Sequence, residues 1–368
     1  MKILITGSNG FIGKNLVSQL AVRKNFEVLR YGRESTADDL QHAIAEADFI
    51  CHMAGVNRPD DAAEFARGNT DLTRTLCQAV RNSGRRVPII FASSVHVEKN
   101  NPYGVSKLAA EQLLLRHSEE TGVPVYIFRL PHVIGKWCQP NYNSVVATFC
   151  HNIARDMPIQ IDDPAYQLEL VHIDDLVATI ARIMTGEEIF GPYCQVAPSY
   201  PITVGELAAQ ILAFRASRSS LVSERVGTGL TRVLYATYVS YLPPERFTYE
   251  VPGFGDSRGV FVEMLKTQDS GQFSFFTSHP GVTRGEHYHH SKTEKFLVIK
   301  GNARFRFRHI MSNESHEICT SGDKPEIVET VPGWAHSITN MGDDEMIVML
   351  WANEIFDHDR SDTYACPV

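Results

Sequence analysis

The chain has 368 residues, 43% of them hydrophobic and 21% charged, which is typical of a globular protein with more than one domain. Its formal net charge of −8 argues against nucleic acid or an anionic membrane surface as the main partner. No stretch reaches the length of a membrane span, and the seven cysteines are scattered without a CxxC pair, so we expect a cytoplasmic protein with reduced thiols.

The first two hundred residues alternate short apolar runs with longer helical ones. The apolar runs at 2–6 (KILIT), 26–29 (FEVL), 48–54 (DFICHMA), 87–94 (VPIIFASS) and 125–130 (VYIFRL) predict buried parallel strands. The stretches 14–23, 69–84 and 103–122 between them predict crossover helices. This alternation indicates an α/β fold with a Rossmann-like, doubly wound parallel sheet.

The last third of the chain has a different texture. Residues 230–242 (LTRVLYATYVSYL) fit either a helix or a strand, and 242–247 (LPPERF) resemble a linker. Beyond them, β-rich runs punctuated by glycine (GVFVEML, GQFSFFTS, EKFLVIKG, ARFRFRHI, EMIVMLWANE) predict an antiparallel all-β barrel. We therefore predict two domains, 1–243 and 244–368.

A glycine-rich turn follows the first predicted strand and opens the first helix. It contains Gly7, Gly10 and Gly13, with Phe11 and Ile12 between the last two. Glycines at this spacing let the backbone approach a pyrophosphate that rests on the helix N-terminus. Alone, such a turn can be no more than a tight bend; its strand–turn–helix context favours dinucleotide binding.

The second predicted strand does not end in an acidic residue. Arg30 and Arg33 stand there instead. An aspartate would bind a free ribose 2′-hydroxyl, whereas arginine suits a 2′-phosphate, so we expect NADPH as the cofactor. The alternative is that both arginines are solvated surface groups.

Tyr103 and Lys107 are four residues apart and share one helical face. Ser94 ends the strand before them, with Ser93 as the second choice. Reduction of a carbonyl needs a proton donor, a nearby cation that lowers the pKa of the donor, and a hydroxyl that polarises the oxygen. These residue types together predict that chemistry, although a lone tyrosine and lysine at this spacing are usually surface residues.

The segments ITGSNGFIGKNL, HMAGVN, FASS, YGVSK, FRLPHVIGKW and LVHIDDLV resemble the extended short-chain dehydrogenases/reductases that act on nucleotide sugars. The resemblance implies that Ser94, Tyr103 and Lys107 are catalytic, and that Ala54, Gly55 and Lys107 contact the cofactor. It also implies a substrate pocket lined by Arg129, His132, Lys136, Asn141 and Asn143.

Histidines gather near the C-terminal end, in the stretch GVTRGEHYHHSKTEKFLVIKG. His287 and His289 are two apart and share one face of a strand; Glu294 and His336 can join them from facing strands. Three imidazoles and one carboxylate suit Zn, Fe, Ni or Mn, and we expect one divalent metal, zinc. The spacing resembles the cupin motifs, although Pro332 directly precedes Gly333, a departure that leaves the geometry of that turn open.

The segments DSRGVFVE and GVTRGEHYH also resemble metal-free sugar-nucleotide 3,5-epimerases. That resemblance implies that His287 is a base and that Arg258, Glu263 and Arg284 touch the nucleotide or sugar. The two implications for His287 conflict. If it binds the metal, the base is a neighbour such as Tyr288, His290 or Lys266, or water on the metal; alternatively, the metal is structural.

The whole chain resembles the bifunctional reductase–epimerases of bacterial capsule and O-antigen synthesis. This implies C3 epimerisation of a UDP-2-acetamido-2,6-dideoxy-4-keto-hexose by the cupin domain. NADPH-dependent reduction of the C4 ketone would then give UDP-2-acetamido-2,6-dideoxy-L-talose, in a homodimer. The alternative is a monofunctional reductase whose metal-stabilised barrel serves dimerisation or sugar binding. A dehydratase is disfavoured because Val95 and His96 replace the usual acidic pair.

Overall fold

The computed structural model of the protein describes residues 1–187, 191–251, 253–256, 259–262, 265–267, 271–354 and 361–368. The chain forms two compact units, each made of two stretches: Met1–Val133 with Leu168–Pro201, and Ile134–Gln167 with Ile202–Val368. It passes from one unit to the other within the strands β6 (His132–Ile134), β7 (Gln167–His172) and β9 (Ser199–Thr203). The predicted division of the two folds at residues 243 and 244 stays a prediction.

The first unit contains a six-stranded parallel sheet in the order β2-β1-β3-β4-β5-β8. Its elements are β1 (Lys2–Thr6), α1 (Phe11–Ala21), β2 (Glu27–Tyr31), α2 (Ala37–Glu46), β3 (Phe49–His52), α3 (Ala63–Phe65), η1 (Ala66–Asp71), α4 (Leu72–Asn82), β4 (Ile89–Ser94), η2 (Val95–Glu98), α5 (Pro102–Thr121), β5 (Val125–Leu130), α7 (Ile173–Thr185) and β8 (Tyr193–Cys194). The predicted Rossmann-like sheet is confirmed.

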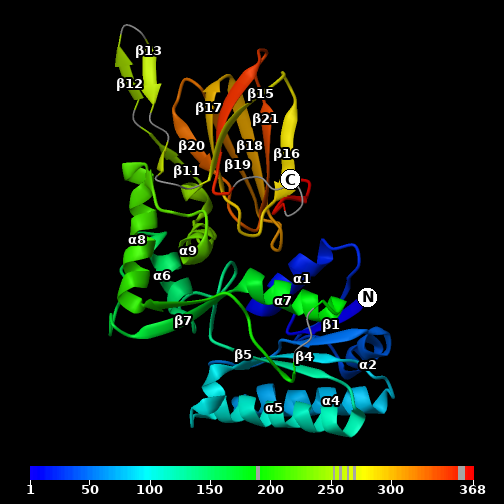
Figure 1. The fold of residues 1–368 in the computed structure, drawn as a ribbon. Helices are drawn as coiled ribbons and strands as arrows, with labels where there is room; N and C mark the ends of the chain where they lie inside the picture. Colours follow the sequence, from blue (N-terminus) through cyan, green and yellow to red (C-terminus); the bar gives the residue numbers. More distant parts are fainter. Residues whose placement is uncertain (188–190, 252, 257–258, 263–264, 268–270, 355–360) are drawn as a thin grey trace. The chain divides into compact units, whose positions relative to one another are not determined.

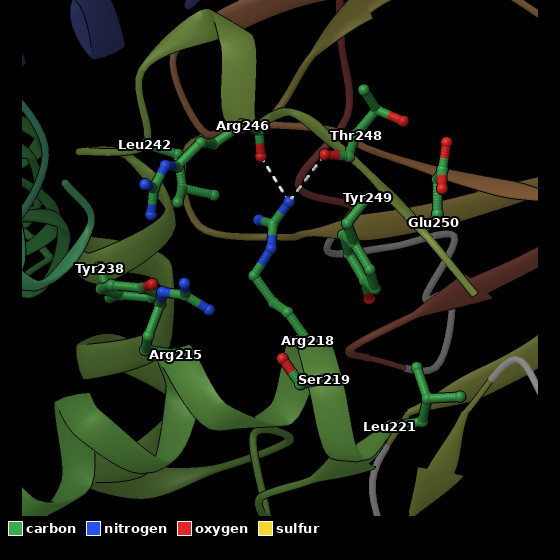
Figure 2. Close-up of a pocket in the computed structure, with 10 residues that line it drawn as sticks. All are labelled: Arg215, Arg218, Ser219, Leu221, Tyr238, Leu242, Arg246, Thr248, Tyr249 and Glu250. Carbon is green, nitrogen blue, oxygen red and sulfur yellow. Dashed lines mark hydrogen bonds between the residues drawn. The ribbon is translucent and has the colours of Figure 1, made fainter. Parts of the chain in front are cut away.

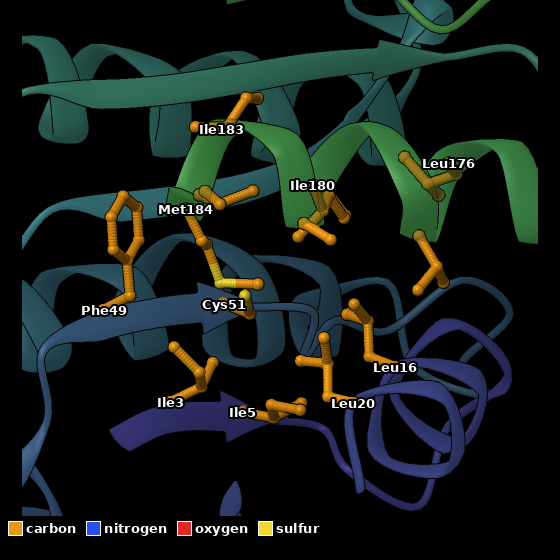
Figure 3. Packing of buried hydrophobic residues seen from close by; sticks show 14 of the residues in the cluster. Ile3, Ile5, Leu16, Leu20, Phe49, Cys51, Leu176, Ile180, Ile183 and Met184 are labelled. Carbon is orange, nitrogen blue, oxygen red and sulfur yellow. The ribbon is translucent and has the colours of Figure 1, made fainter. Parts of the chain in front are cut away.

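Helices cover both faces of this sheet, with α1 and α7 on one face and α4 and α5 on the other (Figure 1). Along β1, Ile3 and Ile5 pack against the α1 and α7 side, as Figure 3 shows, whereas Leu4 packs into the opposite cluster. Successive strand residues point to opposite faces, so a strand that is covered twice must be apolar throughout. This double burial explains why the N-terminal strands appear in the sequence as unbroken apolar runs.

The second unit joins a helical layer to antiparallel sheets. Its helices are α6 (Val145–Ile153), α8 (Val204–Ser220), α9 (Gly229–Val239) and the short η3 (Pro244–Arg246). The two five-stranded sheets have the orders β11-β20-β17-β22-β15 and β19-β18-β21-β16-β23. Their strands are β11 (Thr248–Glu250), β15 (Gln272–Ser278), β16 (Thr283–Tyr288), β17 (Glu294–Lys300), β18 (Asn302–His309), β19 (Ser315–Ser321), β20 (Glu326–Glu329), β21 (Trp334–Asn340), β22 (Met346–Ala352) and β23 (Tyr364–Ala365). Two smaller pairs complete the unit: the parallel β10 (Val222–Ser223) and β14 (Lys266–Thr267), and the antiparallel β12 (Gly253–Asp256) and β13 (Gly259–Val262).

The predicted C-terminal all-β architecture is confirmed, and its core follows from strand alternation. Ala303, Phe305 and Phe307 occupy alternate positions of β18 and are all buried. Phe247, which follows η3, contacts the rings of Phe307 and Trp334 at centroid distances of 5.5 and 5.2 Å. The stretch that fitted a helix or a strand is the helix α9, which packs against α6 and α8. Within the described ranges, no helix combines the length and apolarity that a membrane span requires.

Candidate active site and metal centre

The glycine turn holds the end of β1, the start of α1 and the loop after β3 in close contact. Gly7 has φ +66°, and a Cβ there would lie 2.7 Å from backbone atoms of Ala54. A Cβ on Gly13 would overlap the carbonyl oxygen of Gly7, which accepts a hydrogen bond of 2.9 Å from the Gly10 amide. Only glycine fits at positions 7 and 13, and helix α1 begins directly afterwards at Phe11 and Ile12. The tight turn brings the helix N-terminus to the sheet edge where a pyrophosphate would bind.

Arg30 and Arg33 flank the carboxyl end of β2, next to this turn. Arg30 is paired in register with Ile5 of β1, and both arginine side chains are exposed. The intervening Gly32 donates its amide to Ser35 Oγ at 3.0 Å. Neither guanidinium forms an ion pair with any carboxylate in the described part of the chain. Both charges are therefore open to an anionic ligand at this edge.

Ser94, Tyr103 and Lys107 come together where β4 ends and α5 begins. Asn101 caps α5 by accepting the Gly104 amide at 2.8 Å, and Tyr103 lies in the first turn of that helix. Burial raises the pKa of Tyr103, while a hydrogen bond with Ser94 opposes that rise. The phenol is thus protonated at neutral pH and already paired with the hydroxyl that was predicted beside it.

Lys107 is buried one turn further along α5. Its ammonium donates to the Ala92 carbonyl at 2.9 Å and lies 4.8 Å from the ring centroid of Phe91. Burial lowers the pKa of Lys107 to about 8, and the negative charge of Glu111 partly offsets this decrease. A Cβ on Gly55 would lie 3.0 Å from the ammonium, so the predicted cofactor loop and the predicted catalytic lysine are in contact.

A buried cluster that the sequence analysis missed separates the two candidate serines. Glu111 is fully buried and accepts hydrogen bonds from Ser93 Oγ at 2.5 Å and from Arg129 Nη2 at 2.8 Å. Arg129 also lies 4.5 Å above the ring of Tyr193. Ser93 is therefore bound to Glu111, while Ser94 remains beside Tyr103. The signal was present, because Glu111 is one helical turn after Lys107.

The other predicted substrate residues of the reductase differ in exposure. His132 is half-buried, and burial lowers its pKa, with smaller effects from His96 and Lys99. Lys136 is buried, with its ammonium 5.3 Å from the ring of Trp137. Asn141 and Asn143 are exposed just before α6.

Of the residues predicted to touch the nucleotide or sugar in the barrel, Arg258 and Glu263 lie outside the described residues, as does the side chain of Lys266. Arg284 is exposed on β16 and donates to the Thr277 carbonyl at 3.0 Å.

The four predicted metal ligands converge inside the barrel. One ligand atom from each of His287, His289, Glu294 and His336 lies within 4.8 Å of the others. The ring centroids of His287 and His336 are 4.6 Å apart. Glu294 Oε2 lies 3.1 Å from His289 Nε2 and 3.4 Å from His336 Nε2. His287 lies on β16, Glu294 on β17 and His336 on β21, and His289 directly follows β16.

A bulge in β16 aims His287 at this cluster. The register with β21 shifts between Gly285 and His287, and Gly285 and Glu286 have φ +100° and +58°. A Cβ on Gly285 would lie 2.9 Å from the His336 carbonyl oxygen, so glycine is needed there. After the bulge, His287 pairs directly with His336. The extra residue rotates the strand so that the imidazole faces its partners.

Asp362 supports the cluster from a distant segment. Its backbone carbonyl contacts His289 Nδ1 at 2.5 Å. Its carboxylate accepts the amides of His290, Ser291 and Lys292 at 2.9, 2.7 and 2.8 Å. A carbonyl at Nδ1 fixes the tautomer that leaves the Nε2 lone pair directed at the cluster, the arrangement usual for a metal-bound histidine.

The protonation states in the cluster fit a divalent metal. Burial lowers the pKa of His287 to about 4 and also lowers the pKa of His336. Burial alone would raise the pKa of Glu294, but His289 and His336 hold it well below its usual range. Neutral imidazoles and an ionised carboxylate are the forms that bind metal. Both ring nitrogens of His336 are buried and lack a hydrogen bond of standard geometry in the described part of the chain, and Nε2 lies 3.4 Å from Glu294 Oε2.

The turn before His336 contains Pro332 directly before Gly333, which is the departure from the cupin spacing seen in the sequence. Gly333 has φ +82°, and its amide donates to the His289 carbonyl at 2.9 Å. A Cβ there would lie 2.9 Å from the ring of Trp137, whose Nε1 donates to His309 Nε2 at 2.9 Å. With Pro332 directly before the glycine, the turn leads into β21, which brings His336 into the cluster. Trp137 was not among the predicted site residues.

Comparisons with known proteins match both units. Residues 3–191 match the NAD dependent epimerase/dehydratase family, and residues 254–364 match the polysaccharide biosynthesis C-terminal domain. The chain is 59% identical, over all of its 368 residues and 99% of the relative, to UDP-2-acetamido-2,6-beta-L-arabino-hexul-4-ose reductase of Pseudomonas aeruginosa. The crystal structure of the capsular polysaccharide assembling protein CapF from Staphylococcus aureus covers 100% of both chains at 41% identity, with a TM-score of 0.69. The structure of RMD from P. aeruginosa complexed with NADPH covers 58% of this chain and 82% of its own at 23% identity, with a TM-score of 0.53, and shows the shared fold alone.

Proposed function

The chain belongs to the NAD dependent epimerase/dehydratase family and carries a polysaccharide biosynthesis C-terminal domain; from that membership we propose that it is a bifunctional nucleotide-sugar enzyme. The proposed substrate is a UDP-2-acetamido-2,6-dideoxy-4-keto-hexose, and the product is UDP-2-acetamido-2,6-dideoxy-L-talose. The barrel epimerises C3, and the reductase then reduces the C4 ketone with NADPH. The observation that carries the proposal is full-length identity of 59% to a UDP-hexul-4-ose reductase in a chain that also brings four candidate metal ligands together.

In the proposed reduction, Tyr103, Ser94 and Lys107 each have a separate role. A bound NADPH would supply hydride to C4, and Tyr103 gives its proton to the ketone oxygen, which becomes a hydroxyl. Ser94 holds the phenol in position through the hydrogen bond between them. Lys107, buried against Ala92 and adjacent to Gly55, supplies the positive charge that stabilises the phenolate left behind.

The epimerisation requires the same ketone. A carbonyl at C4 acidifies the hydrogen on C3, so a base removes that proton to give an enediolate, and reprotonation from the other face inverts the carbon. Reduction removes the carbonyl and with it this acidity. The barrel must therefore act before the reductase, and the order of the two reactions follows from their chemistry.

The proposed metal is zinc, held by His287, His289, Glu294 and His336. A divalent ion in this position would supply positive charge that stabilises a developing enediolate. His287 belongs to the ligand set and is therefore not the base. Tyr288, which is buried at the end of β16 beside Tyr364, and His290 are the neighbouring residues from which the base would come.

One experiment on the full-length chain tests both activities. The UDP-4-keto sugar is incubated with NADPH in D2O, and the product is analysed by NMR. We expect a C4 alcohol together with deuterium at C3, because the carbon is protonated from solvent. Reduction without deuterium would support a monofunctional reductase. The absence of both reduction and deuteration would contradict the whole proposal.

NADPH is expected to bind more tightly than NADH because Arg30 and Arg33 are exposed and pair with none of the carboxylates in the described ranges. A charge-assisted contact to phosphate contributes roughly 1.5–3 kcal/mol, so Arg33→Ser should weaken NADPH binding by about 10–100-fold while NADH binding stays constant. Fluorescence titration with both cofactors measures this. Arg116→Ser, which removes an exposed arginine from α5, is the matched control. Equal affinity of the native chain for the two cofactors would contradict the assignment.

The homodimer and the cytoplasmic location expected from the sequence remain predictions. Size-exclusion chromatography with light scattering determines the first.

A further inference from the structure

A cavity of about 400 Å³ in the second unit has no role in either proposed reaction. Its walls come from the end of α8, the end of α9, the last residue of η3 and the strand β11 (Figure 2). Three arginines line it: Arg215, Arg218 and Arg246. The volume is within the range of small-molecule sites. The concentration of cations in one cavity raises the question of what they bind.

Arg215 and Arg246 share a single carboxylate. Asp156 accepts Arg215 Nε at 3.0 Å and Arg246 Nη2 at 2.5 Å. The hydrogen bonds from Arg246 and Arg215 hold the pKa of Asp156 far below its usual range, so its one negative charge is always present. Two guanidinium groups against one carboxylate leave one positive charge uncompensated. Both side chains are about one third exposed and can reach a ligand.

Arg218 repeats this imbalance at the base of the cavity. Its Nη1 donates to Glu329 Oε2 at 2.8 Å, and Lys295 forms an ion pair with the same buried carboxylate. The Nη2 of Arg218 donates to the carbonyls of Arg246 and Thr248, as Figure 2 shows. Two cations again meet one carboxylate, so the base also carries an uncompensated positive charge.

Two hydroxyl groups of the cavity wall lack an acceptor. Tyr238 is 1% exposed, and its hydroxyl has no hydrogen-bond partner in the described part of the chain; Thr248 Oγ1 is in the same condition. The hydroxyl end of Tyr238 lies beside the guanidinium of Arg215 in Figure 2. Buried hydroxyl groups are normally hydrogen-bonded, and each missing bond is unfavourable. An oxyanion that reached this end would supply acceptors where donors are in excess.

The opposite end of the cavity has a different chemistry. Glu250 lies across from Arg215 and Arg246, and its exposed carboxylate is 3.4 Å from Lys324. Such a carboxylate repels an anion but accepts hydrogen bonds from sugar hydroxyls. The ring of Tyr249 and the side chain of Leu221 also line the cavity. A ligand that fits both ends has an anionic head and a hydroxyl-rich body.

We propose that this cavity binds a phosphorylated sugar of about hexose size. The phosphate lies among Arg215, Arg218 and Arg246, and the sugar hydroxyls face Glu250. Inorganic phosphate alone fills only the arginine end and binds more weakly.

Calorimetric titration of the full-length chain with glucose 6-phosphate, inorganic phosphate and glucose tests the proposal. We expect binding in that order of affinity, undetectable for glucose, and weakened by added salt because charges are involved. Arg246→Gln should lower the affinity for glucose 6-phosphate by about 10-fold or more. Arg306→Gln is the matched control, because Arg306 is an exposed arginine on β18 that pairs with Glu317 at 3.7 Å.

Glu250→Gln separates the two ends of the ligand. Removal of its charge should leave phosphate affinity unchanged or increase it, while glucose 6-phosphate loses its advantage over phosphate. Tyr238→Phe deletes one oxygen and keeps the ring packing, so it provides a second test of the site if an arginine variant unfolds. This variant should also weaken phosphate binding. No binding of either phosphate at millimolar concentration overturns the proposal. Binding that neither Arg246→Gln nor Tyr238→Phe alters would place the phosphates elsewhere and overturn it equally.

Discussion

Tyr103→Phe is expected to lower the rate of NADPH oxidation by about 10²-fold or more, because the phenol is the only proton donor assigned to the ketone. The substitution removes the hydroxyl that pairs with Ser94 but keeps the ring. That ring packs against Phe65 and His96 at centroid distances of 5.9 Å, so the fold of this region should persist. Stopped-flow absorbance with the UDP-4-keto sugar measures the loss.

Cofactor affinity provides the internal control for this variant. Lys107 and the glycine turn are unchanged, so NADPH should bind Tyr103→Phe and the native chain equally. Tyr126→Phe, which alters a half-buried tyrosine on β5, should retain native oxidation rates. If Tyr103→Phe oxidises NADPH at a near-native rate, the assignment of the acid is wrong.

His336→Ala is expected to release the metal and abolish exchange at C3. The loss of an outer hydrogen-bond partner typically costs 10–100-fold in metal affinity, and loss of a direct ligand should exceed that roughly 100-fold limit. The cleanest background is the full-length Tyr103→Phe chain without NADPH, because it can epimerise but not reduce. In D2O, that chain should incorporate deuterium at C3, and the double variant with His336→Ala should not.

Metal content and stability distinguish a ligand from a structural histidine. His279→Ala, at an exposed position before β16, should keep native metal content and exchange. His336→Ala should lower the thermal midpoint, as should chelation of the native chain, because ligation links β16, β17 and β21. Full metal content in His336→Ala would contradict the ligand set. A folded, metal-loaded chain without exchange would leave the barrel as a binding or dimerisation module.

The convergence of the four candidate metal ligands could be predicted in part from the sequence. His287 and His289 are two residues apart, with His287 on β16 and His289 directly after its last residue, and the resemblance to the cupin spacing supplied Glu294 and His336. What the spacing could not supply was the bulge at Gly285 and Glu286, which turns His287 inward. Bulges depend on the partner strand, and here a β-carbon on residue 285 would meet the His336 carbonyl.

The reductase site shows where local reasoning stops. Ser93 and Ser94 are adjacent, and the sequence ranks them only by resemblance. Glu111 distinguishes the two serines in the structure, because its carboxylate accepts hydrogen bonds from the hydroxyl of Ser93 and the guanidinium of Arg129. A pairing between a helix and two strands is a tertiary contact without a short-range signal. For the same reason, the sequence did not reveal that Arg129, which is predicted as a substrate contact, also pairs with a buried carboxylate.

The helix α9 shows a limit of a different kind. Residues 230–242 mix β-branched and aromatic residues, which favour a strand, at spacings that also suit a helix. Tyr235, Tyr238 and Val239 are all buried, so the segment is apolar around most of its circumference. The 3.6-residue periodicity that would indicate an amphipathic helix is therefore weak. Packing against α6 and α8 decides its conformation, and that packing is absent from any local window.

The buried carboxylate of Glu329 limits where a transferable barrel could begin in this chain. The barrel itself contributes Lys295, but Arg218 and Tyr235, which donate to the same carboxylate, come from helices that precede residue 243. Loss of one partner from a buried ion pair costs about 3–5 kcal/mol, a large part of the stability of an ordinary domain. A barrel transferred between genes at residue 244 would keep the ion pair between Lys295 and Glu329 but lose the hydrogen bonds that Arg218 and Tyr235 donate to that carboxylate. A cassette that keeps all three partners of Glu329 must therefore begin no later than α8, so the helices α8 and α9 of the second unit belong with the barrel.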